Sequence, residues 1–259
     1  MLGRFLELSV QTADIRASLD FYERLGFSAA EVGEAWPHPY AVVTDGRLHV
    51  GLHQAASQET ANFPGAALTF VKPDLLASLD EFESLGVQFE FRRLGNDVFN
   101  EVGWFDPSGH LIRLVEARTF SPAKRQPGEI ANCGYFLEIG LPAAQIDLAK
   151  SYWERLGFIG MAEPNAHPPH ICCMSDTIDL GLYDPADLRR PTLLFDADDP
   201  DACITHLRER GIEPSAGMPA ALRGSPGALL IAPEGTPIII ASLTGAPGLD
   251  ASGIHIAGA

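Results

Sequence analysis

The sequence has few basic residues, few cysteines and no long apolar run. Its 259 residues include 18 Lys and Arg against 34 Asp and Glu, which gives a formal net charge of −16. Nucleic acids and anionic membrane surfaces both attract clustered positive charge, so we expect neither as a partner. No apolar stretch approaches the about 20 residues that a membrane-spanning helix needs, so we expect no membrane insertion.

Several familiar motifs are also missing from the sequence. The four cysteines form no CxxC pair, and the only adjacent two, Cys172 and Cys173, would point to opposite faces of a strand. The chain does not open with a basic segment followed by an apolar one, which predicts no secretory signal. These features predict a cytoplasmic protein with reduced thiols. Glycine-rich nucleotide-binding loops and the common hydrolase motifs are absent too.

The chain contains one domain twice. The segment FYERLGF at residues 21–27 recurs as YWERLGF at residues 152–158, and Glu7 then aligns with Glu138 without a gap. Further matching blocks follow in the same order, including LDEFESLGV at residues 79–87 with ITHLRERGI at residues 204–212. Five such blocks at a nearly constant offset indicate a duplication.

The repeat also predicts the domain boundaries. We expect one domain at residues 1–117 and a second at residues 133–243. Residues 118–132 are polar and contain proline, as is typical of a linker. Residues 244–259 are rich in Gly and Ala and are expected to form a loose tail.

Each copy is itself doubled in its pattern of strands and helices. Alternating residues predict a first strand, and a helix follows with Asp14 as its N-cap and Gly26 just past its end. Three strand-like runs come next, and then the order restarts, so each copy reads βαβββ–βαβββ. Two such modules with mostly antiparallel strands predict an α+β fold with helices covering one side of a curved sheet.

Three features together resemble the vicinal oxygen chelate (VOC) superfamily of glyoxalases, bleomycin-resistance proteins and extradiol dioxygenases. They are the helix endings FYERLGF and YWERLGF, the paired βαβββ modules, and the signature FDPSGHLIRLVE at residues 105–116, weaker as IAPEGTPIIIAS at residues 231–242. The resemblance implies a cleft between the two modules of each copy. It also implies that metal ligands, where present, come from the first and last strands of each module and bind Fe, Mn, Ni or Zn. Metal-free members bind antibiotics or other small molecules.

The positions where the resemblance would place metal ligands are largely vacant. His and carboxylate ligands suit these metals, and the first strands offer Glu7 and Glu138. The fourth strands offer Gly51 and Gly181, which have no donor side chain. The fifth strand offers Ala67 or its neighbours. At the last position the first copy has Arg113, whose positive charge would repel a metal. We therefore expect no metal; if one binds, Glu7 and Glu138 are its candidate ligands.

The same positions of the first copy offer a ligand site of another kind. Alternation places polar side chains on the cleft face if the family geometry holds, namely Glu7, His49, His53 and Arg113. Arg113 could clamp a ligand carboxylate or form an internal ion pair with Glu7. The two histidines could instead lie at the surface or rim. Aromatic side chains that could form the walls of the cleft are Trp36, Tyr40 and Trp104, although ordinary packing explains them as well.

The first hypothesis is a metal-free protein that binds a small organic molecule in the first copy, with a more apolar, structural second copy. One alternative is a metal-dependent glyoxalase-like lyase or ring-cleaving dioxygenase. Another is a structural or interaction module. A monomer and a homodimer are both compatible with four modules in one chain.

Overall fold

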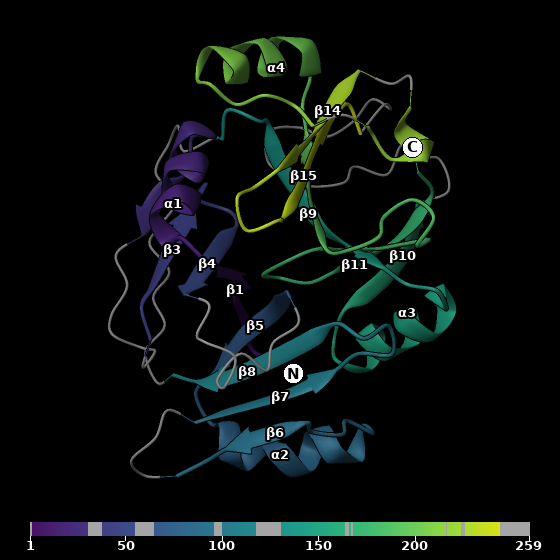
Figure 1. The fold of residues 1–259 in the computed structure, drawn as a ribbon. Helices are drawn as coiled ribbons and strands as arrows, with labels where there is room; N and C mark the ends of the chain where they lie inside the picture. The colour runs from purple at the N-terminus through teal and green to yellow at the C-terminus, as the bar shows by residue number, and fades with distance from the viewer. Residues whose placement is uncertain are drawn as a thin grey trace.

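The computed structural model describes residues 2–30, 38–54, 65–95, 100–117, 131–163, 166, 168–215, 217–223 and 226–243 (Figure 1). The predicted wall residue Trp36, most of the predicted linker and the predicted tail lie outside these residues. No described helix is long and apolar enough to cross a membrane.

The first copy has the predicted order of strands and helices. Asp14 caps the first helix as predicted, because its side chain accepts a hydrogen bond from the backbone N–H of Ala17. Gly26 ends that helix with a positive φ of 92°, as predicted for a residue in the left-handed conformation. The elements are β1 (Arg4–Thr12), α1 (Ile15–Arg24), β2 (Ser28–Ala30), β3 (Tyr40–Thr44), β4 (His49–Gln54), β5 (Ala66–Lys72), α2 (Leu75–Ser84), β6 (Phe91–Arg93), β7 (Glu101–Phe105) and β8 (Leu111–Glu116).

The second copy departs from the predicted order at one strand. Where β6 pairs with β7 in the first copy, the described part of the second copy has only a single bridge between Ser215 and Leu229. Pro214 precedes the bridge and has no backbone N–H to extend a ladder. The elements are β9 (Tyr135–Pro142), α3 (Ile146–Arg155), β10 (Ile159–Glu163), β11 (His170–Met174), β12 (Leu180–Tyr183), β13 (Thr192–Asp196), α4 (Pro200–Glu209), a 3-10 turn (Ala220–Leu222), β14 (Gly227–Ile231) and β15 (Pro237–Ala241).

Each copy forms one mixed sheet from both of its modules. The first sheet has the order β2-β3-β4-β1-β5-β8-β7-β6 and the second has β10-β11-β12-β9-β13-β15-β14. The modules join where the first strands pair antiparallel, β1 with β5 and β9 with β13. The two sheets therefore have the same topology, except that β6 has no counterpart among the described residues of the second copy.

The two copies share one hydrophobic core. In Figure 1, α1 lies beside the turn that joins β14 to β15 of the second copy, and α3 lies near β7 and β8 of the first. The Tyr22 hydroxyl of α1 donates to Glu234 at 2.8 Å, and the indole N–H of Trp104 donates to the Tyr152 hydroxyl of α3 at 2.5 Å. The first module of each copy thus contacts the second module of the other copy. A single cluster of buried side chains spans both copies.

Candidate functional site

A row of buried polar side chains crosses the first sheet on the face opposite its core. Strand pairing sets Glu7 of β1 beside Thr69 of β5, and Thr69 beside Arg113 of β8. Their neighbours Ser9, His53 and Glu101 are buried as well. We call these six side chains the polar row. Buried polar groups cost free energy unless they are hydrogen-bonded, so the partners of each one matter.

Glu7 is the centre of the first half of the polar row. Its Oε1 atom accepts from the Ser9 hydroxyl at 2.6 Å and lies 2.7 Å from His53 Nε2. The Ser9 and Thr69 hydroxyl oxygens are 2.7 Å apart. The Tyr40 ring is stacked on the His53 ring, with centroids 5.6 Å apart and an interplanar angle of 13°. His53 is therefore buried and hydrogen-bonded and does not lie at a rim.

Arg113 is the centre of the second half. Its Nη2 atom donates to Glu101 Oε2 at 2.5 Å, and the other oxygen of Glu101 accepts from Arg93 on β6. Glu101 is buried, whereas the Arg93 side chain is 61% exposed. Arg113 therefore forms its ion pair with Glu101, which was not among the predicted site residues, and not with Glu7. Glu7 pairs with His53 instead.

Not all predicted site residues join the polar row. His49 lies on the same face of β4 as Gly51 and is half-buried, and burial lowers its pKa. Trp104 does not line this face, contrary to the prediction. It is fully buried on the other side of the sheet, against Phe82 and Phe89, because β7 alternates and Gly103 is the residue that pairs with Arg113.

Gly51 is what makes room for the Glu7 carboxylate. A Cβ atom added at Gly51 would lie 2.1 Å from Glu7 Oε1, and its three nearest atoms all belong to Glu7. The second copy repeats this arrangement with Gly181 and Glu138, also at 2.1 Å. Gly51 and Gly181, which the alignment placed at metal-ligand positions, therefore leave the space that a buried glutamate carboxylate occupies.

We predict that Gly51→Ala displaces the Glu7 carboxylate and lowers the free energy of unfolding by about 2 kcal/mol, within the usual range for overpacking. Urea unfolding would measure the loss. Gly160→Ala is the matched control, because the added Cβ meets mainly the flexible Lys150 side chain. The same Gly51→Ala change should cost less in a Glu7→Ala background. Equal costs in both backgrounds would show that Glu7 is not what the new Cβ meets.

The second copy has an apolar row in the equivalent place. Leu194 of β13 and Ile239 of β15 occupy the registers of Thr69 and Arg113. Gly140 replaces Ser9, and a Cβ there would lie 2.5 Å from the Leu188 side chain. These leucines form a buried cluster with Tyr183, Leu222 and Ile239. The face that is polar in the first copy is thus filled by hydrophobic side chains in the second.

In the second copy, the buried Glu138 also contacts one tyrosine and one histidine, but these two residue types have exchanged strands. Tyr183 stands where the first copy has His53, and its hydroxyl donates to Glu138 Oε1 at 2.5 Å. His170 stands where the first copy has Tyr40, with Nε2 at 3.3 Å from the same oxygen. Burial lowers the pKa of His170, but its hydrogen bond to Glu138 and the charge of that carboxylate outweigh burial, so the pKa is raised.

The residues present do not fit the metal centre that the VOC resemblance implies. Among the described residues, no three His, Cys, Asp or Glu side chains converge on a point where a metal could bind. In the first copy, the Glu7 carboxylate contacts Nε2 of the His53 ring. Nε2 of His38 lies 2.9 Å from Nδ1 of the same His53 ring. The two nitrogens of one imidazole point in different directions, so these three side chains cannot surround one ion in this arrangement.

A cavity lined by residues of both copies lies away from the polar row. It has a volume of about 430 Å³ and lies between the copies, lined by the start of β1, by residues 156–159 and by residues 174–177. Its two charged lining residues, Arg4 and Asp176, are exposed. Because it holds no buried charged group, we regard the polar row as the better candidate site.

Comparisons with known proteins agree with this fold. A sequence model described as Glyoxalase/Bleomycin resistance protein/Dioxygenase superfamily matches residues 4–114. No curated protein sequence matches the chain.

Three similar solved structures are remote in sequence. Homoprotocatechuate 2,3-dioxygenase from Brevibacterium fuscum is 15% identical, with a TM-score of 0.57 over 95% of this chain and 73% of that one. A catechol 2,3-dioxygenase is 15% identical, with a TM-score of 0.53 over 91% and 86%. The Mn(II)-bound glyoxalase from Novosphingobium aromaticivorans is 16% identical, with a TM-score of 0.55 over 91% and 80%. At these identities the likeness concerns the fold alone.

Proposed function

We propose that this chain, whose residues 4–114 match the superfamily model, is a tandem member of the VOC superfamily. We propose further that it binds a small organic molecule at the polar row of its first copy, without a metal at the family's ligand positions. The second copy is then a structural partner whose equivalent face is packed with its own side chains. A cytoplasmic location and a monomeric or dimeric state stay predictions.

The observation that carries the proposal is the contrast between the two copies. The second copy has the same strand register and a buried glutamate beside a glycine, as in the first copy. It has Leu194 and Ile239, however, where the first copy has Thr69 and Arg113. The fold therefore does not need a hydroxyl or a guanidinium at these positions. Burying such groups is costly, so their presence in the first copy favours a role in recognition.

The chemistry of the row indicates what it would bind. A guanidinium held by Glu101 presents its N–H donors in a fixed direction, which suits a carboxylate or another anionic oxygen. The stacked rings of Tyr40 and His53 add a flat surface at the other end of the row. A small molecule with an anionic group and a flat or apolar body matches both features.

The decisive test gives the first copy the apolar residues of the second. Thr69→Leu combined with Arg113→Ile should leave a folded protein that no longer binds molecules recognised by the wild type. Ligand-observed NMR with a library of small aromatic and aliphatic acids would measure this. Ile239→Val in the second copy is the control and should retain all binding. Acids that bind equally well to the double variant would contradict the proposed site.

A metal measurement tests the other part of the proposal. Elemental analysis of gently purified protein should find no stoichiometric Mn, Fe, Co, Ni or Zn. Titration with these ions should not raise the melting temperature, because an ion that binds only the folded state must stabilise it. A metal at full occupancy that is lost in Glu7→Ala would overturn the proposal in favour of a metal-dependent lyase or dioxygenase.

A further inference from the structure

The cavity between the two copies has the composition of a small-molecule site. Its volume of about 430 Å³ lies within the range of roughly 300–1,000 Å³ that is typical of such sites. Three buried apolar side chains line it, Phe70 of the first copy and Leu156 and Phe158 of the second. Arg4 of β1 and Asp176, in the turn between β11 and β12, line it as well. The cavity thus offers an apolar surface and one group of each charge.

The two charged side chains of this cavity are not used by the fold. Within the described ranges, neither Arg4 nor Asp176 has a side-chain hydrogen bond, an ion pair or a ring contact. The two do not pair with each other either. Both are exposed, so this state costs little free energy, and both charges are available to a ligand.

The first copy uses the residue at the position of Asp176 in another way. Its counterpart, Asp45, is buried and accepts hydrogen bonds from two backbone N–H groups of its own turn. In the second copy the Ser175 hydroxyl accepts from the N–H groups of residues 177–178 instead. Asp176 is therefore not needed to hold its turn together.

The position of Arg4 shows the same contrast between the two sides of the interface. Its counterpart at the start of β9 is Tyr135, whose ring packs against the Arg47 guanidinium with 3.9 Å between the guanidinium carbon and the ring centroid. Arg47 belongs to the first copy, so this contact joins the copies. On one side of the interface both positions thus have a structural role, whereas on the other side both carry a charge beside a cavity.

From this arrangement we infer that the cavity between the copies binds a free α-amino acid with an apolar side chain. The guanidinium of Arg4 pairs with the carboxylate of the amino acid, to which it can donate two parallel N–H bonds. The Asp176 carboxylate pairs with the ammonium group. The side chain of the amino acid packs against Phe70 and Phe158, where its burial is favourable. This site is separate from the polar row and does not depend on the proposed function.

The charge of the cavity distinguishes an amino acid from other small molecules. A ligand with a single charge would satisfy either Arg4 or Asp176 and leave the other without a partner. A dicarboxylate would be repelled by Asp176 and by the net charge of −16 of the whole chain. A ligand that carries one charge of each sign matches both side chains at once.

Leucine and two of its derivatives test each contact separately. L-Leucine should bind the wild-type protein and shift the backbone NMR signals of Gly157 and Ile159, which line the cavity. N-acetyl-leucine lacks the ammonium charge and leucine amide lacks the carboxylate. Each derivative should bind about fivefold more weakly, the factor that corresponds to the upper value for an exposed charge pair.

Two variants complete the test, because each should affect only the ligands that carry the matching group. Arg4→Gln should weaken leucine binding about fivefold and leave the binding of leucine amide unchanged. Asp176→Asn should weaken leucine binding by a similar factor and leave the binding of N-acetyl-leucine unchanged. Equal effects of either variant on all three ligands would overturn the assigned contacts.

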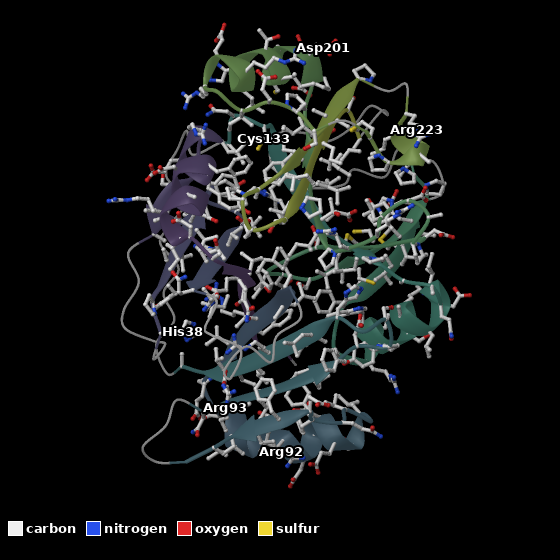
Figure 2. The ribbon with its side chains drawn as sticks, in the orientation of Figure 1. His38, Arg92, Arg93, Cys133, Asp201 and Arg223 are labelled. Atoms are coloured by element: carbon white, nitrogen blue, oxygen red, sulfur yellow. The ribbon has the colours of Figure 1, made fainter. Side chains whose placement is uncertain are left out.

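Matched controls remove one exposed charge of each sign away from the cavity. Arg16→Gln on α1 and Asp201→Asn on α4 should both bind leucine as the wild type does. Figure 2 labels Asp201 at the top of the view, whereas α3, whose C-terminal end leads into the cavity lining, lies on the right in Figure 1.

The outcomes also separate this inference from the proposed function. The variant Thr69→Leu with Arg113→Ile should bind leucine as the wild type does, because its substitutions lie in the polar row. Loss of leucine binding in that variant would place the amino acid at the polar row and overturn the inference. A wild-type protein that binds none of leucine, methionine and phenylalanine would overturn it as well, whether or not acids bind at the polar row.

Discussion

Glu101→Ala should lower the free energy of unfolding by about 3 kcal/mol and abolish binding at the polar row. Removing one partner of a buried ion pair leaves the other charge in a medium that solvates it poorly, which usually costs about 3–5 kcal/mol. Arg113 is 8% exposed and donates to Glu101 at 2.5 Å. We expect the lower end of that range, because Arg113 also has other interactions. Urea unfolding of the two proteins measures the difference.

A neighbouring ion pair supplies the matched control. Arg92 of β6 pairs with Glu83 of α2, but both side chains are almost half exposed. Exposed pairs of this kind contribute at most about 1 kcal/mol, so Glu83→Ala should barely change stability. Equal losses for the two alanine variants would mean that Glu101 does not hold a buried charge, and that Arg113 is positioned by something else.

A second substitution at Glu101 distinguishes an effect on ligand binding from an effect on stability. Glu101→Gln keeps a side chain of the same shape that can still accept from Arg113, but it lacks the charge. We expect this variant to lose less stability than Glu101→Ala. It should still bind acids, and more tightly if the ligand anion replaces the missing charge. A complete loss of binding in Glu101→Gln alone would indicate that Glu101 itself contacts the ligand.

The repeat and the fold could be read from the sequence because they depend on many residues at once. Five matching blocks, a capped helix with a glycine at its end and alternating strands predict the same module four times, and the structure confirms the α+β fold. A single departure such as the bridge at Ser215 does not change the topology. Local patterns of this kind agree with one another, so they support one fold.

The site was harder to predict because its contacts depend on strand register and on loops. Glu7 and Arg113 were found because family positions mark them, but their partners come from other segments. Glu101 lies 12 residues before Arg113, and only the pairing of β7 with β8 brings them together. A signal was present, since Glu101 is the one charged residue of the strand EVGWF. His38 reaches His53 from a loop, which no periodicity predicts.

Trp104 shows that a shift of one residue along a strand determines whether a side chain points to the polar row or to the hydrophobic core. Gly103 pairs with Arg113, so the next residue points to the opposite face of the sheet. That face is covered by helices and by the second copy rather than by a ligand. The side chain accordingly contacts Phe82, Phe89 and Tyr152, all of them aromatic.

We expect Trp104→Ala to lower the free energy of unfolding by about 3–5 kcal/mol, the usual cost of removing a buried tryptophan. Trp104 is fully buried, and its indole N–H donates to Tyr152 of the second copy. Because one core spans both copies, the variant should still unfold in a single transition at lower urea concentration. Circular dichroism would follow both copies, and with Trp36 also replaced by Phe, the fluorescence of the buried Trp153 would report on the second.

The control is Ile159→Ala, whose side chain is 65% exposed and should contribute little. Tyr152→Phe tests the hydrogen bond alone. It leaves the buried indole N–H of Trp104 without this acceptor, which should cost about 1–3 kcal/mol. If Trp104→Ala instead separates the two signals into two transitions, the copies are independent units that merely touch. The apolar second copy would then not be needed to hold the first copy's polar row in place, and the first copy should bind acids when expressed on its own.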